Sequence, residues 1–396
     1  LEWRSTPLSD RVAAPFAGSA PEAARSRVIE AWEELATSAG LPAYVSALPE
    51  LRARAAEYAA SALATLGLDG AVGSPVPDDL ADTLGVHARH RRLLPRLLEI
   101  LGETGYLSGS PDEGYRVLRA LPTSPPTAIP TEDPVRALLD RCGAHLTTVL
   151  TGERDPLELL FPRGSRDTTR SVYRDTGFGR TFNRALGRAV AALGESASGE
   201  RPLRVLEVGA GSGSTTVEVL SALAGRSLRY VFTDVGASLV AEARSEFGER
   251  AGMEFRTFDL ESDPTAQGLD RGEFDLVVAA NVVHATARLD RSLGHLRDLL
   301  APGGVLVLLE GTRPEPWVDL TFGLTEGWWR FSDAEVRDSH PLPSLQGWMD
   351  ALGRAGFESI GAAPFETEID AAGQEAILPR AATMPAVRPL PPKGEL

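Results

Sequence analysis

The spacing of apolar residues gives the chain two distinct textures. From about residue 26 to residue 120, apolar residues recur three and four positions apart, as in VIEAWEELA (28–36), in the 44–66 segment and in RRLLPRLLEILGETG (91–105). This period is typical of amphipathic helices that pack on a core. Between residues 203 and 309, short apolar runs alternate with helical patterns, and these runs lack the strict alternation of half-exposed strands. Such runs are typical of strands that are covered on both faces.

The alternation of strand and helix patterns predicts an α/β fold with a doubly wound, mostly parallel sheet. The expected strands are RVLEVGA (204–210), RYVFTDV (229–235), MEFRTFDL (253–260), FDLVVAAN (274–281) and VLVLLEG (305–311). In a sheet of this kind, ligands bind beyond the carboxyl ends of the strands. Polar residues at those ends are therefore the first candidates for a functional site.

Changes in composition predict where the domains begin and end. Within residues 78–118, the order helix, turn, helix and hairpin around SGSPDEG (108–114) is the outline of a winged helix. A breaker cluster, LPTSPPTAIPTED (121–133), ends that region. The expected division is a linker at 1–25, a helical, winged-helix-like subdomain at 26–133, a helical connector at 134–200, a nucleotide-binding core at 201–385, and a proline-rich linker at 386–396.

The charge balance argues against a nucleic-acid partner, although a winged helix suggests one. The net charge is −15 and Lys393 is the only lysine, whereas a nucleic-acid binder needs a basic face to neutralise phosphates. Pro95, inside the would-be recognition helix, counts against DNA binding as well. The arginine patch HARHRR (87–92) is read either as a solvated helix face or as a docking surface for an acidic partner.

Cysteine content and hydropathy point to a cytoplasmic protein without membrane contact. Cys142 is the only cysteine, so no internal disulfide forms and a reducing compartment fits. No run of about 18 or more uncharged apolar residues occurs. No cluster of His, Cys and carboxylates has the spacing of metal ligands, so we expect no metal.

The turn after the first expected strand, LEVGAGSGSTT (206–216), is glycine-rich. Gly209, Gly211 and Gly213 let the chain turn tightly and approach a ligand closely. A glycine-rich loop alone is a weak signal, but here it lies between a strand and a helix, which is the required context. With Glu207 the loop reads E-x-G-x-G-x-G and not the dinucleotide pattern G-x-G-x-x-G.

Acidic residues follow at the ends of the next two expected strands. Asp234 lies 234 − 213 = 21 residues after Gly213, which suits hydrogen bonds to ribose hydroxyls. Asp259 ends the following strand, where a carboxylate can accept from an adenine amino group. Each acid alone is more often a helix cap or a surface residue. Glu207, Asp234 and Asp259 together, at the ends of three consecutive strands, favour a nucleoside site. An NAD-binding enzyme is the alternative interpretation of this fold.

His284 lies where the fourth expected strand ends, in NVVHATARLD (281–290). A histidine at a strand end often only hydrogen-bonds a backbone carbonyl. Glu310 ends the fifth expected strand, which is the neighbour of the fourth in this fold. A carboxylate there can accept from one imidazole nitrogen, fix the tautomer and stabilise the imidazolium, as the third member of a hydrolase triad does.

Together these features resemble a class I S-adenosylmethionine-dependent methyltransferase, with a Pro-Gly-Gly turn (302–304) before the fifth strand. The 281–304 segment, FGLTEGWWRFSD (322–333) and VYRDTGFGRTFNRAL (172–186) are similar to the carbon-methyltransferase domains of polyketide synthases. ERDPLELLFP (153–162) is similar as well, and LEWRSTPL (1–8) resembles the linker that follows a dehydratase.

The resemblance implies a seven-stranded Rossmann-like core, an N-terminal lid and S-adenosylmethionine as the cofactor. The substrate it implies is a β-ketoacyl thioester on the phosphopantetheine arm of an acyl carrier protein, with neighbouring polyketide synthase domains as further partners. His284 and Glu310 would be the catalytic dyad. The cofactor-binding residues it implies are Glu207, Gly209, Gly211, Gly213, Asp234, Asp259, Leu260 and Asn281. The substrate-positioning candidates are Tyr173, Asn183, Trp328 and Trp329.

The chemistry of such a transfer suits a histidine base. The methyl group on a sulfonium is already activated, so the enzyme must generate a carbon nucleophile. The α-carbon of a β-ketoacyl thioester is acidic, and a positioned imidazole, with a reference pKa of about 6.5, can take its proton. Two other functions stay open: a free-standing small-molecule O-methyltransferase, which can also use a His base, and a decayed scaffold domain.

Two residues of the 172–186 segment need separate expectations. Gly177 replaces a proline that is common in the resembled family, and we expect it to loosen the segment. Arg180 faces either the cofactor carboxylate or solvent.

Overall fold

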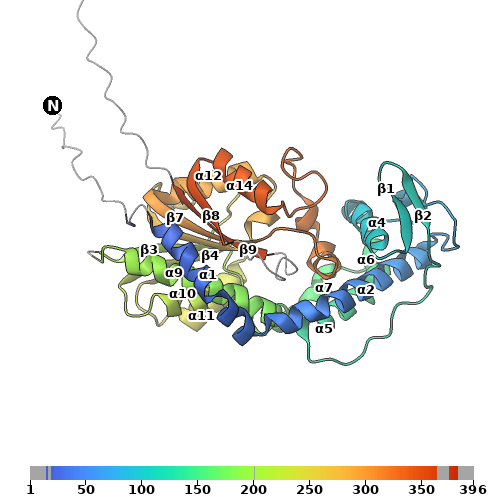
Figure 1. Cartoon of the computed structure of the whole chain (residues 1–396), viewed down its shortest axis with the longest axis horizontal. Helices are drawn as coiled ribbons and strands as arrows, with labels where there is room; N and C mark the ends of the chain where they lie inside the picture. The colour runs from blue at the N-terminus through green and yellow to red at the C-terminus, as the bar shows by residue number, and fades with distance from the viewer. Residues whose placement is uncertain (1–14, 17–18, 200, 364–373, 382–396) are drawn as a thin grey trace, which may run out of the picture.

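The computed structural model describes residues 15–16, 19–199, 201–363 and 374–381, and Figure 1 shows two lobes. The sheet lobe holds a seven-stranded sheet between layers of helices. The helical lobe, residues 41–174, holds short helices and a two-stranded hairpin. The long helix α2 (Leu41–Leu66) runs from one lobe to the far end of the other.

The seven-stranded sheet has the order β5-β4-β3-β6-β7-β9-β8. The first five of these strands pair in parallel, and β9 pairs antiparallel with β7 and β8. The strands are β3 (Leu203–Val208), β4 (Leu228–Asp234), β5 (Met253–Thr257), β6 (Phe274–Ala280), β7 (Leu300–Gly311), β8 (Phe357–Ala362) and β9 (Gln374–Ala381). The strand order reverses between β3 and β6, which places a crevice at their carboxyl ends. The predicted α/β, doubly wound, mostly parallel fold is confirmed.

Successive residues of the central strands enter two different cores. Val278 and Val307 pack in the core under α1 and α9, whereas Val277 and Leu306 pack in the core under α12 and α14. This explains why the strands have no polar alternation. The helices of the sheet lobe are α1 (Ala20–Ala39), α9 (Gly177–Ser196), α10 (Ser214–Ala222), α11 (Ala237–Phe247), α12 (Leu289–Leu299) and α14 (Leu345–Arg354), with a 3₁₀ turn η3 (Thr265–Gln267).

Helix α1 corrects the expected linker at 1–25. The helix already begins at Ala20, with Pro21 in its first turn, where a proline costs no hydrogen bond. Its buried residues Ala24, Val28 and Trp32 recur every four positions, and the Trp32 ring lies 5.7 Å from that of Phe182 on α9. The helix therefore belongs to the sheet lobe. The expected linker residues 1–14 and 17–18, and the expected 386–396 linker, lie outside the described residues.

The helical lobe contains the predicted winged-helix outline. Its helices and strands are α2, α3 (Leu80–Thr83), η1 (Ala88–His90), α4 (Leu93–Glu103), β1 (Leu107–Ser110) and β2 (Gly114–Val117). Strands β1 and β2 form an antiparallel hairpin. Pro95 lies in the first turn of α4, where its missing N–H has no intrahelical partner to lose. Pro95 therefore does not interrupt α4 and carries no weight against DNA binding, whereas the argument from net charge does not depend on it.

The connector consists of short helices that complete the helical lobe. They are α5 (Pro134–Gly143), α6 (Leu146–Leu150), α7 (Pro156–Leu160), η2 (Pro162–Gly164) and α8 (Asp167–Arg174). A later segment, residues 312–344, returns to this lobe and packs Trp317, Leu324 and Phe331 into its core. That segment contains α13 (Pro316–Asp319), η5 (Phe322–Leu324) and η6 (Glu326–Trp329). No helix in the described part of the chain has the length and apolarity of a membrane crossing.

Candidate active site

The three glycines of the turn between β3 and α10 do not all have the same structural role. All three have positive φ: 61° at Gly209, 56° at Gly211 and 75° at Gly213. A Cβ at Gly209 would lie 2.2 Å from Val282, and one at Gly213 would lie 2.8 Å from Phe247. At Gly211 the nearest atom would be 3.9 Å away. Two of the glycines thus make room for neighbouring side chains, and Gly211 leaves its backbone open.

A cavity of about 220 Å³ lies at the carboxyl ends of β3 and β6. The glycine-rich turn forms one wall, and Tyr173 of α8 and Asn183 of α9 form another. Asn281, directly after β6, closes a third side in the left-handed conformation, with φ of 53°, that asparagine tolerates better than most residues. Its N–H donates to the Leu309 carbonyl at 2.7 Å. The cavity has the position expected for a nucleotide-type ligand.

Glu207 lies beneath this turn and does not line the cavity. Its side chain is 1 % exposed, and Oε2 accepts hydrogen bonds from Thr216 Oγ1 and Tyr230 Oη, both at 2.6 Å. Burial raises the pKa of Glu207 to about 7, against the lowering effect of these two hydrogen bonds. The carboxyl group therefore connects β3, β4 and α10 at the base of the turn.

The two downstream acids are held by backbone and hydroxyl donors of the protein. Asp234 accepts from the Gly211 N–H at 3.0 Å and from the Gly236 N–H at 2.8 Å, so it positions the glycine-rich turn. Asp259 accepts from the Glu261 N–H at 2.9 Å and from Ser262 Oγ at 2.8 Å. Neither residue lines the cavity, and contacts of these acids with ribose or adenine stay predictions.

Leu260 has a buried side chain in the core under α12. Its carbonyl oxygen lies 2.7 Å from His295 Nδ1, which must be the donor. A contact of Leu260 with the cofactor stays a prediction as well.

His284 and Glu310 form a buried hydrogen-bonded pair. His284 lies in the 3₁₀ turn η4 (Val283–Ala285), directly after β6, and Glu310 lies near the end of the adjacent strand β7. His284 Nδ1 is 2.6 Å from Glu310 Oε2, with the residues 7 % and 0 % exposed. Glu310 Oε1 accepts from the N–H groups of Val282 and Val283 at 3.0 and 2.7 Å. A carboxylate that only accepts places the imidazole proton on Nδ1 and leaves a lone pair on Nε2.

A second, mostly aromatic cavity of about 60 Å³ lies beside His284. Trp328 contacts the imidazole edge to face, with ring centroids 5.0 Å apart. Tyr173, Asn281 and Phe322 line this cavity and the cavity at the glycine-rich turn, so the two meet. A base at the junction of two cavities can reach a substrate in one while a cofactor occupies the other.

The helical lobe supplies part of the second cavity. Tyr44 of α2 lines it and accepts a hydrogen bond from Trp317 Nε1 at 3.0 Å. Glu315 lines it too, and Arg52 of α2 holds this carboxylate with bonds of 2.8 and 3.0 Å. None of these residues was identified from the sequence. Each hydrogen-bonded pair, Tyr44 with Trp317 and Arg52 with Glu315, joins residues more than 260 positions apart, and no local motif contains them.

The four predicted substrate-positioning residues have different environments. Asn183 uses its amide on the protein: Nδ2 donates to the Tyr173 carbonyl at 2.9 Å, and Oδ1 accepts from Thr215 Oγ1 at 2.8 Å. Desolvation, followed by the charge on Glu310, raises the pKa of Tyr173, so its phenol stays protonated. Trp328 lines the second cavity. Trp329 lines neither cavity, because its Nε1 donates to the Gly323 carbonyl at 2.7 Å and its ring packs in the helical-lobe core. A substrate contact by Trp329 is therefore not supported.

Gly177 and Arg180 brace the start of α9. A Cβ at Gly177 would lie 2.2 Å from the Gly40 carbonyl oxygen, so glycine permits close packing and does not loosen the segment. Arg180 donates to the Ala39 carbonyl at 2.8 and 3.1 Å and to the Asp175 carbonyl at 2.7 Å. It caps the end of α1 and its side chain is exposed, which agrees with the solvent-facing alternative.

The arginine patch at 87–92 is partly structural. Arg92 donates to the carbonyls of Trp329 and Phe331 and lies over the Phe331 ring at 4.0 Å. His90 is 1 % exposed. Arg92 thus fixes the segment that carries Trp328, and only part of the patch is available to a partner.

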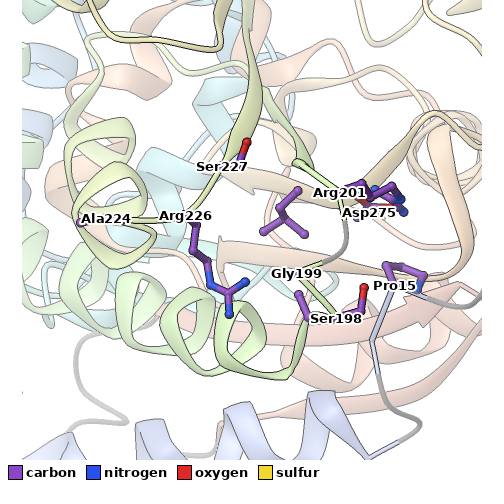
Figure 2. A pocket seen from close by; sticks show the side chains of 11 residues that line it. Pro15, Ser198, Gly199, Arg201, Ala224, Arg226, Ser227 and Asp275 are labelled. Atoms are coloured by element: carbon purple, nitrogen blue, oxygen red, sulfur yellow. Dashed lines mark hydrogen bonds and ion pairs between the residues drawn. The ribbon is translucent and has the colours of Figure 1, made fainter.

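A larger cavity, of about 400 Å³, lies at the opposite edge of the sheet (Figure 2). Arg201 and Asp275 line it beside the amino ends of β3 and β6, away from the glycine-rich turn. Arg201 pairs with Asp275 at 2.5 and 2.7 Å, and Arg204 pairs with the same carboxylate at 2.7 Å. Within the described residues, no group of three or more His, Cys, Asp or Glu could hold a metal ion.

Comparison with known proteins identifies the family of the chain. Residues 206–306 match the family model described as "Methyltransferase domain". The structure of the CurJ carbon methyltransferase superposes with a TM-score of 0.84, at 33 % identity, covering 91 % of this chain and 99 % of that one. The citrinin polyketide synthase CMeT domain superposes with a TM-score of 0.78, at 27 % identity, covering 93 % and 98 %.

The curated relatives are much longer proteins. The non-reducing polyketide synthase mapC of Penicillium roqueforti (strain FM164) is 36 % identical over 311 residues, which are 74 % of this chain and 12 % of that protein. The chain thus corresponds to one segment of a multidomain synthase. It belongs to the carbon methyltransferase domains of polyketide synthases, which are S-adenosylmethionine-dependent methyltransferases of the class I fold.

Proposed function

We propose that the chain methylates the α-carbon of a β-ketoacyl thioester, carried on the phosphopantetheine arm of an acyl carrier protein, with His284 as the base. The observation that carries the proposal is the buried pair of His284 and Glu310, 2.6 Å apart, where two cavities meet. The similarity to polyketide synthases supports this substrate class. Neighbouring synthase domains and a cytoplasmic location belong to the same proposal.

The cavity at the glycine-rich turn has the features that S-adenosylmethionine requires. Gly211 has room above its backbone, and Leu239 adds an apolar side chain to the wall. Gly209, Gly211 and Asn281 would hold the cofactor, with Glu207 and Asp234 supporting the turn from behind. When bound, the cofactor supplies a methyl group activated by the adjacent sulfonium charge.

The protein's own contribution is to generate the carbon nucleophile. His284 Nε2 takes the α-proton, the C–H bond breaks, and its electron pair delocalises onto the carbonyl oxygen as an enolate. The imidazolium that forms is stabilised by Glu310, which already accepts from Nδ1. Because Glu310 is also fixed by two backbone N–H groups, the pair needs no reorganisation when the proton arrives.

Tyr173 is the proposed donor to the enolate oxygen. Its raised pKa keeps the phenol neutral and able to donate. It lines both cavities, and its backbone carbonyl is held by Asn183. Asn183 then acts on the substrate through Tyr173, and Trp328 forms an apolar wall beside the base.

The helical lobe is inferred to act as a lid over the substrate. Tyr44 of α2 and Tyr173 of α8 bring residues from 26–133 and 134–200 to the second cavity. The aromatic side chains of this cavity support an acyl chain as its ligand, with Arg313 and Glu315 as charged residues on the wall.

Mass spectrometry of the carrier protein tests the proposed function. We expect a β-ketoacyl acyl carrier protein, incubated with the chain and S-adenosylmethionine, to gain one CH₂ on its acyl arm. A carrier loaded with a simple acyl chain, which lacks the acidic α-carbon, is the matched control and should gain none. Methylation of a free phenol without any gain on the carrier would overturn the proposal in favour of an O-methyltransferase. Absence of cofactor binding in calorimetry would indicate a decayed domain.

A further inference from the structure

The turn that carries His284 is held from its other side by a buried arginine. Arg337 is 1 % exposed and lies in the loop between η6 and α14. Its guanidinium donates to the carbonyls of His284 at 2.8 Å, Thr286 at 2.9 Å and Ala287 at 3.1 Å. Three carbonyls of one short turn therefore converge on a single cation.

Asp333 completes the arrangement. It accepts from Arg337 Nε at 2.7 Å through Oδ1, and from the Leu289 N–H at 2.8 Å through Oδ2. Burial lowers the pKa of Arg337, and the Asp333 carboxylate counters that effect. Arg337 and Asp333 together carry no net charge. They hydrogen-bond to the backbone of the turn at both ends, at His284 and at Leu289, the first residue of α12.

The turn has separate supports on its two sides. Glu310 binds the N–H groups of Val282 and Val283 and the His284 ring, whereas Arg337 binds the carbonyls that follow. Removing the Glu310 contacts would release the ring, and removing the Arg337 contacts would release the backbone that aims it. A misplacement of about 1 Å at a reacting group can cost about 10²-fold in rate.

We propose that Arg337, together with Asp333, is a positioning unit that holds the backbone of the 284–289 turn, so that the His284 ring stays on Glu310 with Nε2 toward the substrate cavity. The catalytic part of this inference rests on the proposed role of His284 as the base. The geometric part does not, because it concerns only the hydrogen bond between His284 and Glu310.

The test uses two variants and a matched control. Arg337→Lys keeps the charge but cannot serve three carbonyls and a carboxylate from one fork. The double variant Asp333→Asn with Arg337→Met removes both charges and leaves no unpaired buried ion. Arg204→Lys is the control, because Arg204 also pairs with a fully buried carboxylate, Asp275, at the opposite edge of the sheet. Thermal unfolding establishes that each variant is folded.

The first readout is the downfield proton resonance of the Nδ1–H between His284 and Glu310, assigned by its loss in His284→Ala. We expect the resonance to persist in Arg204→Lys and to broaden or vanish in both Arg337 variants. The second readout separates kcat from KM. We expect kcat to fall about 10²-fold in the double variant and less in Arg337→Lys, with the cofactor KM unchanged.

Two results would overturn the inference. One is an intact resonance with wild-type kcat in the folded double variant. The other is an equal loss of kcat and resonance in Arg204→Lys, which would show a general effect of destabilisation. If the wild-type chain does not methylate the carrier, the proposed function fails, but the resonance still decides whether Arg337 positions the imidazole.

Discussion

Glu310 accepts three hydrogen bonds and has no role as a donor in the structure. Oε1 takes two backbone N–H groups and Oε2 takes the Nδ1–H of His284. Every one of these bonds requires an acceptor. The residue therefore sets the imidazole tautomer through its chemistry as well as its position.

Glu310→Gln tests that requirement at constant size. The amide oxygen can stay on the two N–H groups, but the NH₂ group then faces Nδ1 and forces the proton onto Nε2, which blocks the base. We expect kcat to fall about 10³- to 10⁴-fold, as for other histidines that lose an orienting carboxylate. Steady-state kinetics and cofactor calorimetry check the result, with unchanged cofactor affinity as the internal control. Wild-type kcat in this variant would refute the orienting role.

Glu207 predicts a pH dependence of stability. Its pKa is raised to about 7 in the folded chain, above the unfolded value of about 4.3, so the folded state holds the extra proton between these values. The group therefore costs stability progressively as pH rises from about 4.5 to about 7. We expect the free energy of unfolding of Glu207→Gln to rise relative to that of the wild type as pH rises, by up to about 3 kcal/mol at pH 8. Urea unfolding at pH 5 and pH 8 measures the difference, and a constant offset would contradict it.

At the scale of elements, the start of α9 depends on a close approach to the corner between α1 and α2. A side chain at Gly177 would collide with the backbone of Gly40. We expect Gly177→Ala to lower the free energy of unfolding by about 1–3 kcal/mol through overpacking. Gly294→Ala on α12 is the matched control, because nothing lies within 4 Å of its Cβ position. This substitution should raise the free energy of unfolding by about 0.5–1 kcal/mol. Equal effects of the two substitutions would contradict this account of α9.

The strands and the glycine-rich turn were predictable from the sequence because local patterns encode them. Doubly covered strands leave continuous apolar runs, and glycines with positive φ mark the turn. The first residues of α1, 20–25, were assigned to the linker because alanine and proline supply the buried face there, which weakens the apolar period. The hydrogen bonds of Trp329 and Arg180 were not predicted for another reason. Their partners, Gly323 and Ala39, are backbone carbonyls, and no sequence pattern identifies such acceptors.

The pairing of His284 with Glu310 was predictable for a related reason. Both residues end neighbouring strands of a sheet whose order follows from the fold class. Arg337 and Asp333 were not identified as functional, because they lie in irregular backbone about 50 residues after the turn they hold. The residues at strand ends were thus predictable, whereas residues whose partners lie far along the chain were not.

At the scale of the whole molecule, buried and part-buried ion pairs join the helical lobe to the 312–344 segment beside the second cavity. Arg96 of α4 binds Asp319 at 2.8 Å, and the same carboxylate lies 2.9 Å from His340 Nε2. Arg52 of α2 binds Glu315 on the cavity wall. The 312–344 segment is thus fixed to the helical lobe by these pairs, and to the turn of His284 in the sheet lobe by Arg337.

Hydrogen exchange at the α-carbon tests most directly whether His284 removes the substrate proton. A β-ketoacyl acyl carrier protein is placed in D₂O with S-adenosylhomocysteine in place of the methyl donor, so that no methyl transfer interferes. The account predicts that the wild-type chain accelerates deuterium uptake at the α-carbon above the rate in buffer, and that His284→Ala returns it to the buffer rate. Uptake by His284→Ala at the wild-type rate would contradict the account.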